Sequence, residues 1–420
     1  MAEAGNKDMS KTGGTVLIIG AGTMGAGIAQ VAAAGGWHAF LCDVDESRVS
    51  EAVAGVVKRF DRLVEKGRLT SEERDAACSR LRAGKDEDGA DADLAIEAVV
   101  ESIDVKVAVF RSLLERVPAR CILASNTSSL SIGDMAAALS DSPDGSNAGR
   151  LVGMHFFNPV PLMPLVEVIS TPQAKADRVT RAAEIAASWG KTVVHCLDTP
   201  GFIVNRVARG YYLEAMRMLG EGVAGIEEID AVMTGAAKFR MGPFALMDLV
   251  GIDVNYTVSC SVYEQKGETA RLKPHEIQAA LFNKKELGRK TGRGFYDYGT
   301  EPAVAAVHVE REPWSCPDGL HKAVDSFFEG ACETVLDEPR DRYIVCRILA
   351  AIFNEAGLAL DDGVATADDI DTAMKLGTNY PRGPIEWSSS VGHERVRALL
   401  CGLDDSVEDG RFRPAKHWIC

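Results

Sequence analysis

Residues 15–43 read T-V-L-I-I-G-A-G-T-M-G-A-G-I-A-Q-V-A-A-A-G-G-W-H-A-F-L-C-D, and this stretch decides the fold of the first part of the chain. An apolar run predicts a strand, the small residues after it favour a helix, and a second apolar run ends in an acid. This order is typical of a βαβ unit, in which a helix joins two parallel strands.

Three glycines, Gly20, Gly22 and Gly25, form a Gly-x-Gly-x-x-Gly pattern directly after the first strand. Glycines let the backbone approach a pyrophosphate, and the helix N-terminus supplies N–H donors and partial positive charge. A bare glycine pattern is also typical of an ordinary tight turn, but the flanking strand and helix and the acid at Asp43 favour a dinucleotide site. A carboxylate there accepts ribose hydroxyls and repels a 2′-phosphate, which predicts NAD over NADP, although Arg48 lies nearby.

Further apolar runs alternate with helical segments as far as residue 199 and predict additional strands. These runs are residues 94–99, 121–124, 151–155, 165–169 and 192–196. Such alternation predicts an α/β fold with a Rossmann-type doubly wound, mostly parallel sheet. From Pro200 onward helical patterns dominate, which predicts all-α C-terminal domains.

Residues 48–82 are charged and periodic, and they predict a helical hairpin with a turn at residues 66–68 and an N-cap at Thr70. The basic residues of this hairpin include Lys58 and Arg59. They either form a solvated face, the commoner case, or contact an anionic ligand.

The helical part contains an internal repeat. Residues 203–251 align without gaps on residues 344–392, at an offset of 141, and sixteen of the 49 pairs are identical. The identical pairs include Arg206 with Arg347 and Glu214 with Glu355. Two similar units can bury matching faces as a symmetric dimer does, which predicts an intrachain pseudo-dimer. A homodimer of whole chains is a further possibility.

These patterns predict five segments along the chain. They are a flexible tail at residues 1–14, an NAD-binding Rossmann domain at 15–199, a helical substrate domain at 200–300, a linker at 301–340 and a second helical repeat at 341–420.

The composition argues against several classes of partner and site. A formal net charge of −15 and a pI near 5.1 disfavour nucleic acids and anionic membranes as partners. The ten cysteines include no Cys-x-x-Cys pair, so neither a zinc site nor a disulfide framework is indicated, and no metal is expected. With no apolar run of about 20 residues and no signal segment, a cytoplasmic location is expected.

Residues 154–169, M-H-F-F-N-P-V-P-L-M-P-L-V-E-V-I, place His155, Asn158 and Glu167 around a Pro-containing segment. A histidine exchanges a proton near neutral pH, a carboxylate stabilises the imidazolium, and an amide holds an oxygen. Taken alone, His155 is equally explained as a structural histidine at a strand end. Because Glu167 falls on another predicted strand and a buried carboxylate needs a partner, we expect the two to meet at one sheet edge and support alcohol oxidation.

Seven segments together resemble the L-3-hydroxyacyl-CoA dehydrogenase family, including its bacterial 3-hydroxybutyryl-CoA and 3-hydroxyadipyl-CoA members, over nearly the whole chain. The segments are G-A-G-T-M-G-A-G from Gly20, E-A-V-V-E from Glu97, A-S-N-T-S-S-L from Ala124, H-F-F-N-P-V-P from His155, D-T-P-G-F-I-V-N-R from Asp198, M-G-P-F-A-L-M-D-L-V-G from Met241 and G-R-K-T-G-R-G-F-Y-D-Y from Gly288. The resemblance implies that a Rossmann domain binds NAD and that an acyl-CoA substrate lies between it and a helical domain.

Carried over residue by residue, the resemblance implies two sets of site residues. The catalytic set is His155 as the base, Glu167 as its carboxylate partner, Ser128 and Asn205 around the substrate oxygen, and Asn158. The cofactor set is Gly20, Gly22, Met24, Gly25, Asp43, Glu101, Lys106 and Asn126. In the second repeat Cys346 stands in place of Asn205 and Ser389 in place of Asp248, so that copy is expected to pack instead of catalysing.

The implied function is reversible, NAD-dependent oxidation of (S)-3-hydroxyacyl-CoA to 3-ketoacyl-CoA, as in fatty-acid β-oxidation, butanoate or phenylacetate-type catabolism. Two other classes stay open. One is a β-hydroxyacid dehydrogenase acting on a free sugar acid, which often uses a lysine, and the other is a non-catalytic nucleotide-binding protein. The sequence does not fix the acyl chain length.

Overall fold

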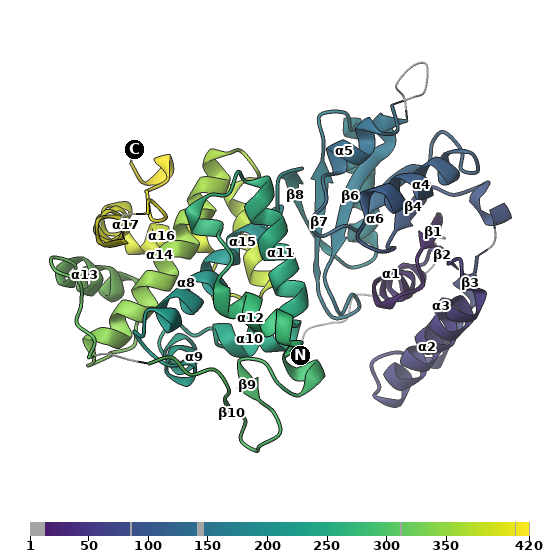
Figure 1. Cartoon of the computed structure of the whole chain (residues 1–420). Coiled ribbons are helices and arrows are strands. Elements are labelled where there is room, and N and C mark those ends of the chain that lie inside the picture. The colour runs from purple at the N-terminus through teal and green to yellow at the C-terminus, as the bar shows by residue number, and fades with distance from the viewer. Residues whose placement is uncertain (1–12, 85, 141–146, 311–312, 408, 420) are drawn as a thin grey trace. The chain divides into compact units, whose positions relative to one another are not determined.

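The computed structural model describes residues 13–84, 86–140, 147–310, 313–407 and 409–419. The chain divides into two compact units, Met1–Asp198 and Thr199–Cys420, which Figure 1 colours purple to blue and teal to yellow. Residues 1–12 of the predicted tail lie outside the described residues. The tail prediction is wrong for Gly13, because its backbone N–H donates to the carbonyl oxygen of Gly36 at 2.9 Å.

The first unit is built on one eight-stranded sheet. Its strands are β1 (Thr15–Ile19), β2 (His38–Cys42), β3 (Leu81–Ala83), β4 (Leu94–Glu97), β5 (Ile122–Ser125), β6 (Leu151–Phe156), β7 (Leu165–Ser170) and β8 (Thr192–Leu197). The strand order is β3-β2-β1-β4-β5-β6-β7-β8, and β6 with β7 is the antiparallel pair in this otherwise parallel sheet. The order reverses between β1 and β4, which confirms the predicted doubly wound arrangement.

Helices cover this sheet, as Figure 1 shows. They are α1 (Thr23–Ala34), α2 (Glu46–Glu65), α3 (Ser71–Arg80), α4 (Ile103–Leu114), α5 (Ile132–Ala137) and α6 (Ala176–Ser188), with the 3₁₀ turns η1 (Asp86–Gly89) and η2 (Ala148–Arg150). Parallel strands covered on both faces need near-continuous apolar sequence, and β4, β5 and β6 are buried at every position.

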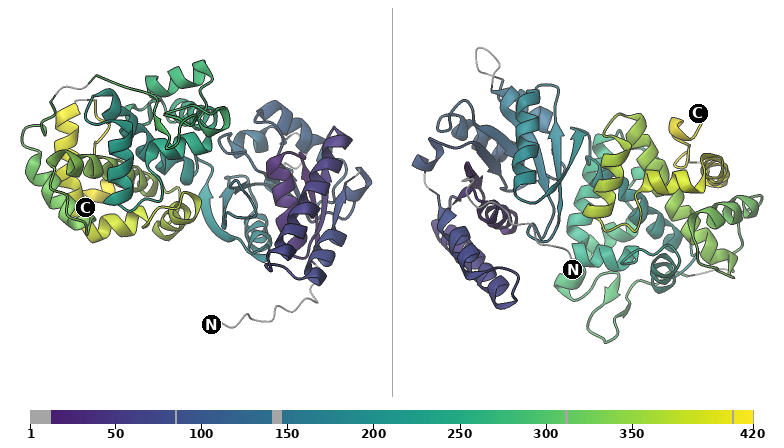
Figure 2. Two further views of the ribbon diagram at one scale, coloured as in Figure 1. Left: turned by 90° about the horizontal axis from the view of Figure 1, so that it is seen from below. Right: turned by 180° about the vertical axis from the view of Figure 1, so that it is seen from behind.

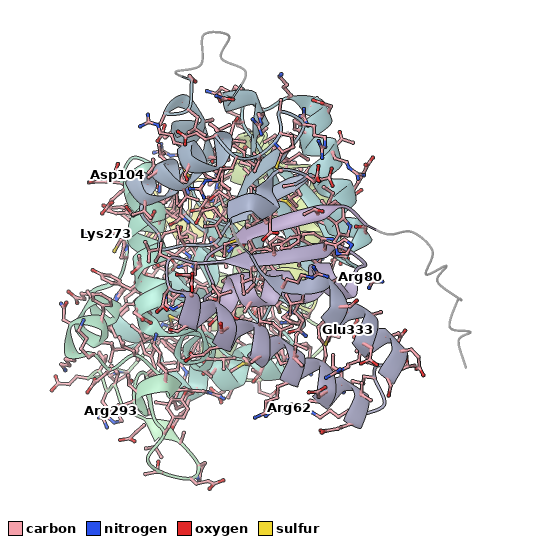
Figure 3. The ribbon with its side chains drawn as sticks, turned by 90° about the vertical axis from the view of Figure 1, so that its right-hand side faces the viewer. Arg62, Arg80, Asp104, Lys273, Arg293 and Glu333 are labelled. Carbon is pink, nitrogen blue, oxygen red and sulfur yellow. The ribbon has the colours of Figure 1, made fainter. Side chains whose placement is uncertain are left out.

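The helical hairpin predicted over residues 48–82 is confirmed as α2 and α3. At its turn, the Thr70 hydroxyl accepts from the Glu73 backbone N–H while the Glu73 carboxylate accepts from the Thr70 backbone N–H. This reciprocal cap satisfies donors that the first turn of α3 leaves without intrahelical partners. Figure 3 labels Arg62 and Arg80 on the two arms of the hairpin.

The second unit is helical, and Figure 2 shows it from two further sides. Its helices are α7 (Val204–Val207), α8 (Arg209–Gly220), α9 (Ile226–Gly235), α10 (Pro243–Val250), α11 (Ile252–Gln265), α12 (Glu276–Lys284), α13 (His321–Ala331), α14 (Pro339–Asp361), α15 (Ala367–Gly377), α16 (Pro384–Val391) and α17 (His393–Val407). Short elements are β9 (Tyr296–Asp297), β10 (Val304–Ala305), η3 (Ala270–Leu272), η4 (Arg289–Thr291) and η5 (Lys416–Trp418).

The segment predicted as a linker, residues 301–340, contains a helix. Helix α13 buries Val324, Phe327, Phe328 and Ala331 and packs against α14, α16 and α17. This part of the segment therefore belongs to the core of the second unit, which corrects the linker prediction.

The two sequence repeats fold alike. In the first, Asp230 on α9 accepts from the backbone N–H groups of Phe244 and Ala245 at 3.0 Å each, and so caps α10. In the second, Asp371 on α15 caps α16 in the same way, with both acceptor distances below 3 Å. All six positions correspond at the offset of 141, so the repeated sequence produces a repeated structure.

The two copies face each other through exchanged ion pairs. Arg206 of the first copy contacts Glu355 of the second at 2.6 Å, and Arg347 of the second contacts Glu214 of the first at 2.9 Å. Because Arg206 is equivalent to Arg347 and Glu214 to Glu355, the contact is isologous, as in a two-fold dimer. The four side chains are almost completely buried. The predicted intrachain pseudo-dimer is therefore confirmed.

Helix α14 is the most apolar long helix of the described residues, and by length and composition it could cross a membrane. Its 18-residue apolar window has a mean hydropathy of 1.6, yet 83% of the window is buried inside the protein. The expectation that no segment is long and apolar enough is wrong for α14. Its packing against α8, α13, α16 and α17 is that of a core helix.

Candidate functional site

The glycine-rich loop between β1 and α1 has the shape that a pyrophosphate needs. Gly20 has φ of +109°, and a Cβ added to Gly25 would lie 1.8 Å from the carbonyl oxygen of Gly20. Glycine is thus required at both positions by the turn itself. At Gly22 an added Cβ would meet nothing within 4 Å, so the backbone there borders open space at the N-terminus of α1. These residues fit a bound dinucleotide.

Asp43 follows β2 and is tied to this loop. Its Oδ2 accepts from the backbone N–H of Ala21 at 2.8 Å, and its Oδ1 accepts from that of Asp45 at 3.2 Å. The carboxylate therefore holds the second strand and the glycine-rich loop together. It stands at the position from which an acid contacts the adenosine ribose in doubly wound folds.

The ends of the central strands lie level with one another. Ile19 on β1 is beside Glu97 on β4, Glu97 is beside Ser125 on β5, and Ser125 is beside Gly153 on β6. Parallel strands thus bring their carboxyl ends, and the loops that follow, to one edge of the sheet. Ligands of such sheets bind at this edge.

A buried ionic network joins β4, α4 and β5. The Glu97 carboxylate accepts from Lys106 Nζ at 2.6 Å, from Ser125 Oγ at 2.8 Å and from the Val99 backbone N–H at 2.7 Å. Glu97 and Lys106 are 0% and 1% exposed. Sequence analysis missed Glu97 and Ser125. A carboxylate inside the apolar run at residues 94–99 was the available signal, since a buried acid requires partners.

Glu101 organises the loop after β5. One of its oxygens accepts from the Thr127 hydroxyl at 2.6 Å and from the Ser128 backbone N–H at 3.0 Å, and the other lies 3.2 Å from Lys106 Nζ. Burial raises the pKa of Glu101, but Lys106 and these hydrogen bonds outweigh it and hold the pKa below its usual value. Glu101 is therefore an anion at neutral pH.

Asn126 connects β5 with β6. Its Oδ1 accepts from the backbone N–H of Phe156 at 2.9 Å, so this amide supports the strand that carries the histidine. Asn158 is exposed on the loop after β6, and Met24 lies in the first turn of α1.

The structure pairs His155 with Glu167. The two residues are direct neighbours in the antiparallel register of β6 and β7, and His155 Nδ1 lies 2.6 Å from Glu167 Oε2. The histidine is 6% exposed and the glutamate 0%. A hydrogen bond from Nδ1 to a carboxylate fixes the orientation and tautomer of the ring, and directs proton exchange to Nε2. The arrangement is therefore suited to general acid–base chemistry.

Asn205 belongs to the second unit, where it lies within the short helix α7. The other predicted catalytic and cofactor residues all belong to the first unit and lie on its central strands, on α1 and α4, or in the loops that follow the strands. Among the described residues, no group of three or more His, Cys, Asp and Glu side chains is arranged to hold a metal ion.

Comparison with known proteins gives a consistent result. Residues 15–199 match the model for the 3-hydroxyacyl-CoA dehydrogenase NAD binding domain, and residues 201–298 and 343–418 each match the model for the C-terminal domain of the same enzymes. The chain is 37% identical to 3-hydroxyadipyl-CoA dehydrogenase of Escherichia coli K12, over 95% of each chain. It is 39% identical to 3-hydroxybutyryl-CoA dehydrogenase of Clostridioides difficile, over 67% of this chain and 99% of that protein.

A solved structure agrees with these matches. The crystal structure of 3-hydroxybutyryl-CoA dehydrogenase from E. coli K12 superposes with a TM-score of 0.84 at 36% identity and covers 97% of each chain. Together with the buried histidine–glutamate pair and the dinucleotide-binding loop, these matches establish that the chain belongs to the 3-hydroxyacyl-CoA dehydrogenase family of NAD-dependent oxidoreductases.

Proposed function

We propose that this chain interconverts (S)-3-hydroxyacyl-CoA and 3-ketoacyl-CoA with NAD as the hydride acceptor. The observation that carries the proposal is the buried His155–Glu167 pair, with 2.6 Å between Nδ1 and Oε2, on strands next to the edge where the glycine-rich loop fits a dinucleotide. Oxidation of an alcohol by NAD requires a base that removes the hydroxyl proton as the hydride leaves carbon, and a histidine oriented by a carboxylate can act as this base.

His155 is the proposed general base. Glu167 holds Nδ1, so Nε2 takes the proton from the 3-hydroxyl in the oxidation and returns it in the reduction. The carboxylate stabilises the imidazolium that forms. NAD, when bound, accepts the hydride from carbon 3.

Three further residues are proposed to arrange the substrate oxygen. Ser128 is held in its loop through the hydrogen bond from its backbone N–H to Glu101, and its hydroxyl is proposed to contact the oxygen. Asn205, from the second unit, is proposed to contribute an amide donor, and Asn158 to help arrange the same centre. Preorganised donors of this kind stabilise charge as it develops on oxygen.

The proposed cofactor residues follow the two halves of a dinucleotide. We infer that the glycine-rich loop holds the pyrophosphate and that Asp43 holds the adenosine ribose. Residues of β4, α4 and β5 are proposed to face the nicotinamide half. The full set is Gly20, Gly22, Met24, Gly25, Asp43, Glu101, Lys106 and Asn126.

We further propose that residues 15–199 bind NAD, residues 200–300 complete the acyl-CoA site, and residues 341–420 serve packing. The names of the relatives support adipyl and butyryl thioesters as the first substrates to test. The acidic composition and the cysteines without paired spacing support a cytoplasmic location.

The His155→Gln variant tests the proposal. Oxidation of NADH by acetoacetyl-CoA, followed by absorbance, should fall about 10²–10⁴-fold because the proton donor is lost. The dissociation constant for NADH, measured by fluorescence, should change little. The control variant His195→Gln alters an exposed histidine on β8 and should keep parental turnover.

Two outcomes contradict the proposal. Turnover of His155→Gln within about tenfold of the parent removes the histidine from its role as the base. Absence of acetoacetyl-CoA reduction by the parent itself, with NADH bound, points instead to another hydroxy acid or to a non-catalytic protein. Comparison of butyryl, medium-chain and adipyl thioesters then determines the preferred chain length.

A further inference from the structure

Three ionisable side chains gather where β4 ends and α4 begins. Lys106 Nζ lies 2.6 Å from Glu97 Oε1 and 3.2 Å from Glu101 Oε2. Glu97 and Lys106 are sealed from solvent, whereas the Glu101 side chain is 36% exposed. We call these three residues the acidic triad.

The triad contains more negative than positive charge. Lys106 supplies one ammonium group, and its shorter contact is with Glu97, which is also bound by Ser125 and the Val99 backbone. Burial raises the pKa of Glu101, but Lys106 and the hydrogen bonds from the next loop lower it by more, so this carboxylate is ionised. One negative charge is left uncompensated within the triad, and Glu101 is its accessible member.

The position of the triad assigns it to one half of the cofactor. Asp43, after β2, contacts the glycine-rich loop on the β1–β2 side of the sheet, which takes the adenosine half in doubly wound folds. The strand order reverses between β1 and β4, so the other half lies over β4, β5 and β6. Glu97 ends β4, and Glu101 holds the loop after β5. The triad is therefore next to the nicotinamide half.

We propose that the acidic triad, through its surplus charge at Glu101, makes the site discriminate between the oxidation states of the cofactor and favours NAD⁺ over NADH. The nicotinamide ring carries a positive charge in NAD⁺ and none in NADH, while the phosphates are the same in both. A fixed anion near the ring therefore lowers the free energy of the NAD⁺ complex but not that of the NADH complex. The attraction is stronger in a partly desolvated site than in bulk water, because charges are screened less there. The bias opposes tight retention of NADH after oxidation of the alcohol.

The test compares dissociation constants for the two forms of the cofactor. NAD⁺ and NADH are titrated separately by calorimetry into the full chain without acyl-CoA, at low salt. In Glu101→Gln, which keeps the side-chain shape, the ratio of the NADH constant to the NAD⁺ constant should fall about tenfold, mainly through weaker NAD⁺ binding. Glu101→Asp keeps the charge and should retain most of the parental ratio.

Two controls separate charge from structure. Asp43→Asn makes the same carboxylate-to-amide change beside the other half of the cofactor, and it should weaken NAD⁺ and NADH binding alike without changing the ratio. Thr127→Val removes a hydrogen bond to Glu101 but keeps its charge, and it should leave the ratio near that of the parent. Raising the ionic strength should move the parental ratio toward that of Glu101→Gln, because Glu101 is partly exposed to screening ions.

The proposal is overturned if Glu101→Gln weakens NAD⁺ and NADH equally, which is the result of a purely structural role. It is also overturned if Glu101→Asp behaves like Glu101→Gln. Neither result bears on the proposed acyl-CoA reaction, because no acyl-CoA is present and the measurements need no turnover.

Discussion

In the first helical copy Asp248 is buried, and in the second its equivalent, Ser389, is exposed. Asp248 accepts from the backbone N–H groups of Phe295 and Tyr296 at 2.9 Å each and from the Tyr298 hydroxyl at 3.1 Å. This carboxylate thus holds residues 295–298 against the first copy, and the exposed Ser389 has no carboxylate for such a role.

Asn205 and Cys346 are a second pair of equivalent positions that differ between the copies. Cys346 is completely buried, and its Sγ contacts the carbonyl oxygen of Val324 on α13 at 3.4 Å, whereas Asn205 is partly exposed. The second copy has a buried thiol that donates to a backbone carbonyl where the first has a partly exposed amide. The arginine and glutamate that join the copies are present in both, as Arg206 with Arg347 and Glu214 with Glu355. Duplication has therefore preserved the interface and released one copy from the proposed site.

The largest effect is expected from breaking the exchanged ion pairs. Arg347→Met removes from Glu214 and Glu221 the arginine that joins them to the second copy, and leaves them Arg217 and Arg411. Arg206→Met likewise leaves Glu355 with Arg271 alone among the described residues. Each variant should lower the free energy of unfolding by about 3–5 kcal/mol, because a buried ion pair is broken and the remaining arginines compensate the carboxylate only in part. Urea unfolding monitored by circular dichroism measures the loss.

An exposed pair provides the control for these variants. Arg181 contacts Glu184 one helical turn away, and both side chains are more than half exposed, so Arg181→Met should change stability by less than about 0.5 kcal/mol. A large loss for Arg347→Met with none for Arg206→Met would break the equivalence of the two copies.

A somewhat smaller effect is expected from acid. Burial raises the pKa of Glu214, but Arg217, Arg347 and Arg411 reverse this and lower it to about 2, from an ordinary 4.5. A carboxyl group whose pKa is lower in the folded than in the unfolded protein stabilises the fold at pH values above its unfolded-state pKa. This contribution is lost as the pH falls toward 2, the folded-state pKa of Glu214.

The parent should therefore lose about 3 kcal/mol more than Glu214→Gln between pH 5 and pH 2. Unfolding curves across this range measure the difference. The exposed Glu184→Gln serves as the reference, and a parallel acid dependence in the parent and Glu214→Gln would show that the Arg cluster does not hold Glu214 ionised.

Next in size is the contrast between equivalent positions of the two copies. Asn205→Ala should lower turnover about 10²-fold, which is typical for the loss of one donor to a developing oxyanion. Cys346→Ala, at the equivalent position, should leave turnover unchanged. Reduction of acetoacetyl-CoA provides the measurement, and equal effects at the two positions would contradict the division of labour between the copies.

The smallest effect is expected at Asp248, which holds residues 295–298 against the first copy. Asp248→Ser should cost about 2 kcal/mol of unfolding free energy, since two backbone donors and a hydroxyl lose their acceptor. Ser389→Asp, at the exposed equivalent, should change stability by less than about 0.5 kcal/mol. Thermal unfolding of both variants tests this pair, and a large cost at Ser389 would mean that the second copy also depends on this position.

Much of the first unit follows from local sequence. The glycine pattern and the alternation of apolar runs predicted seven of the strands and the doubly wound sheet. The antiparallel direction of β7 was also accessible, because eight residues join β6 to β7, and a parallel crossover needs a dozen or more. Strand β3 was missed because it is three residues long and has one buried side chain.

The site was predictable only in part. His155 and Glu167 were expected to meet because a buried carboxylate needs a partner, and the register places them side by side. The contacts between Glu97, Lys106 and Ser125 connect segments that are distant in sequence, so only the sheet order reveals them. The repeat predicted a pseudo-dimer, but the exchange of Arg and Glu partners depends on how α8 and α14 cross.

That crossing has an evolutionary consequence. A Cβ added to Gly210 would lie 2.9 Å from the backbone of Ala351, its counterpart in the other copy. Where two identical subunits meet on such an axis, one codon change inserts two bulky groups that collide. In this chain the two halves are encoded separately, so the second copy carries Ala351 while Gly210 of the first copy leaves room for it.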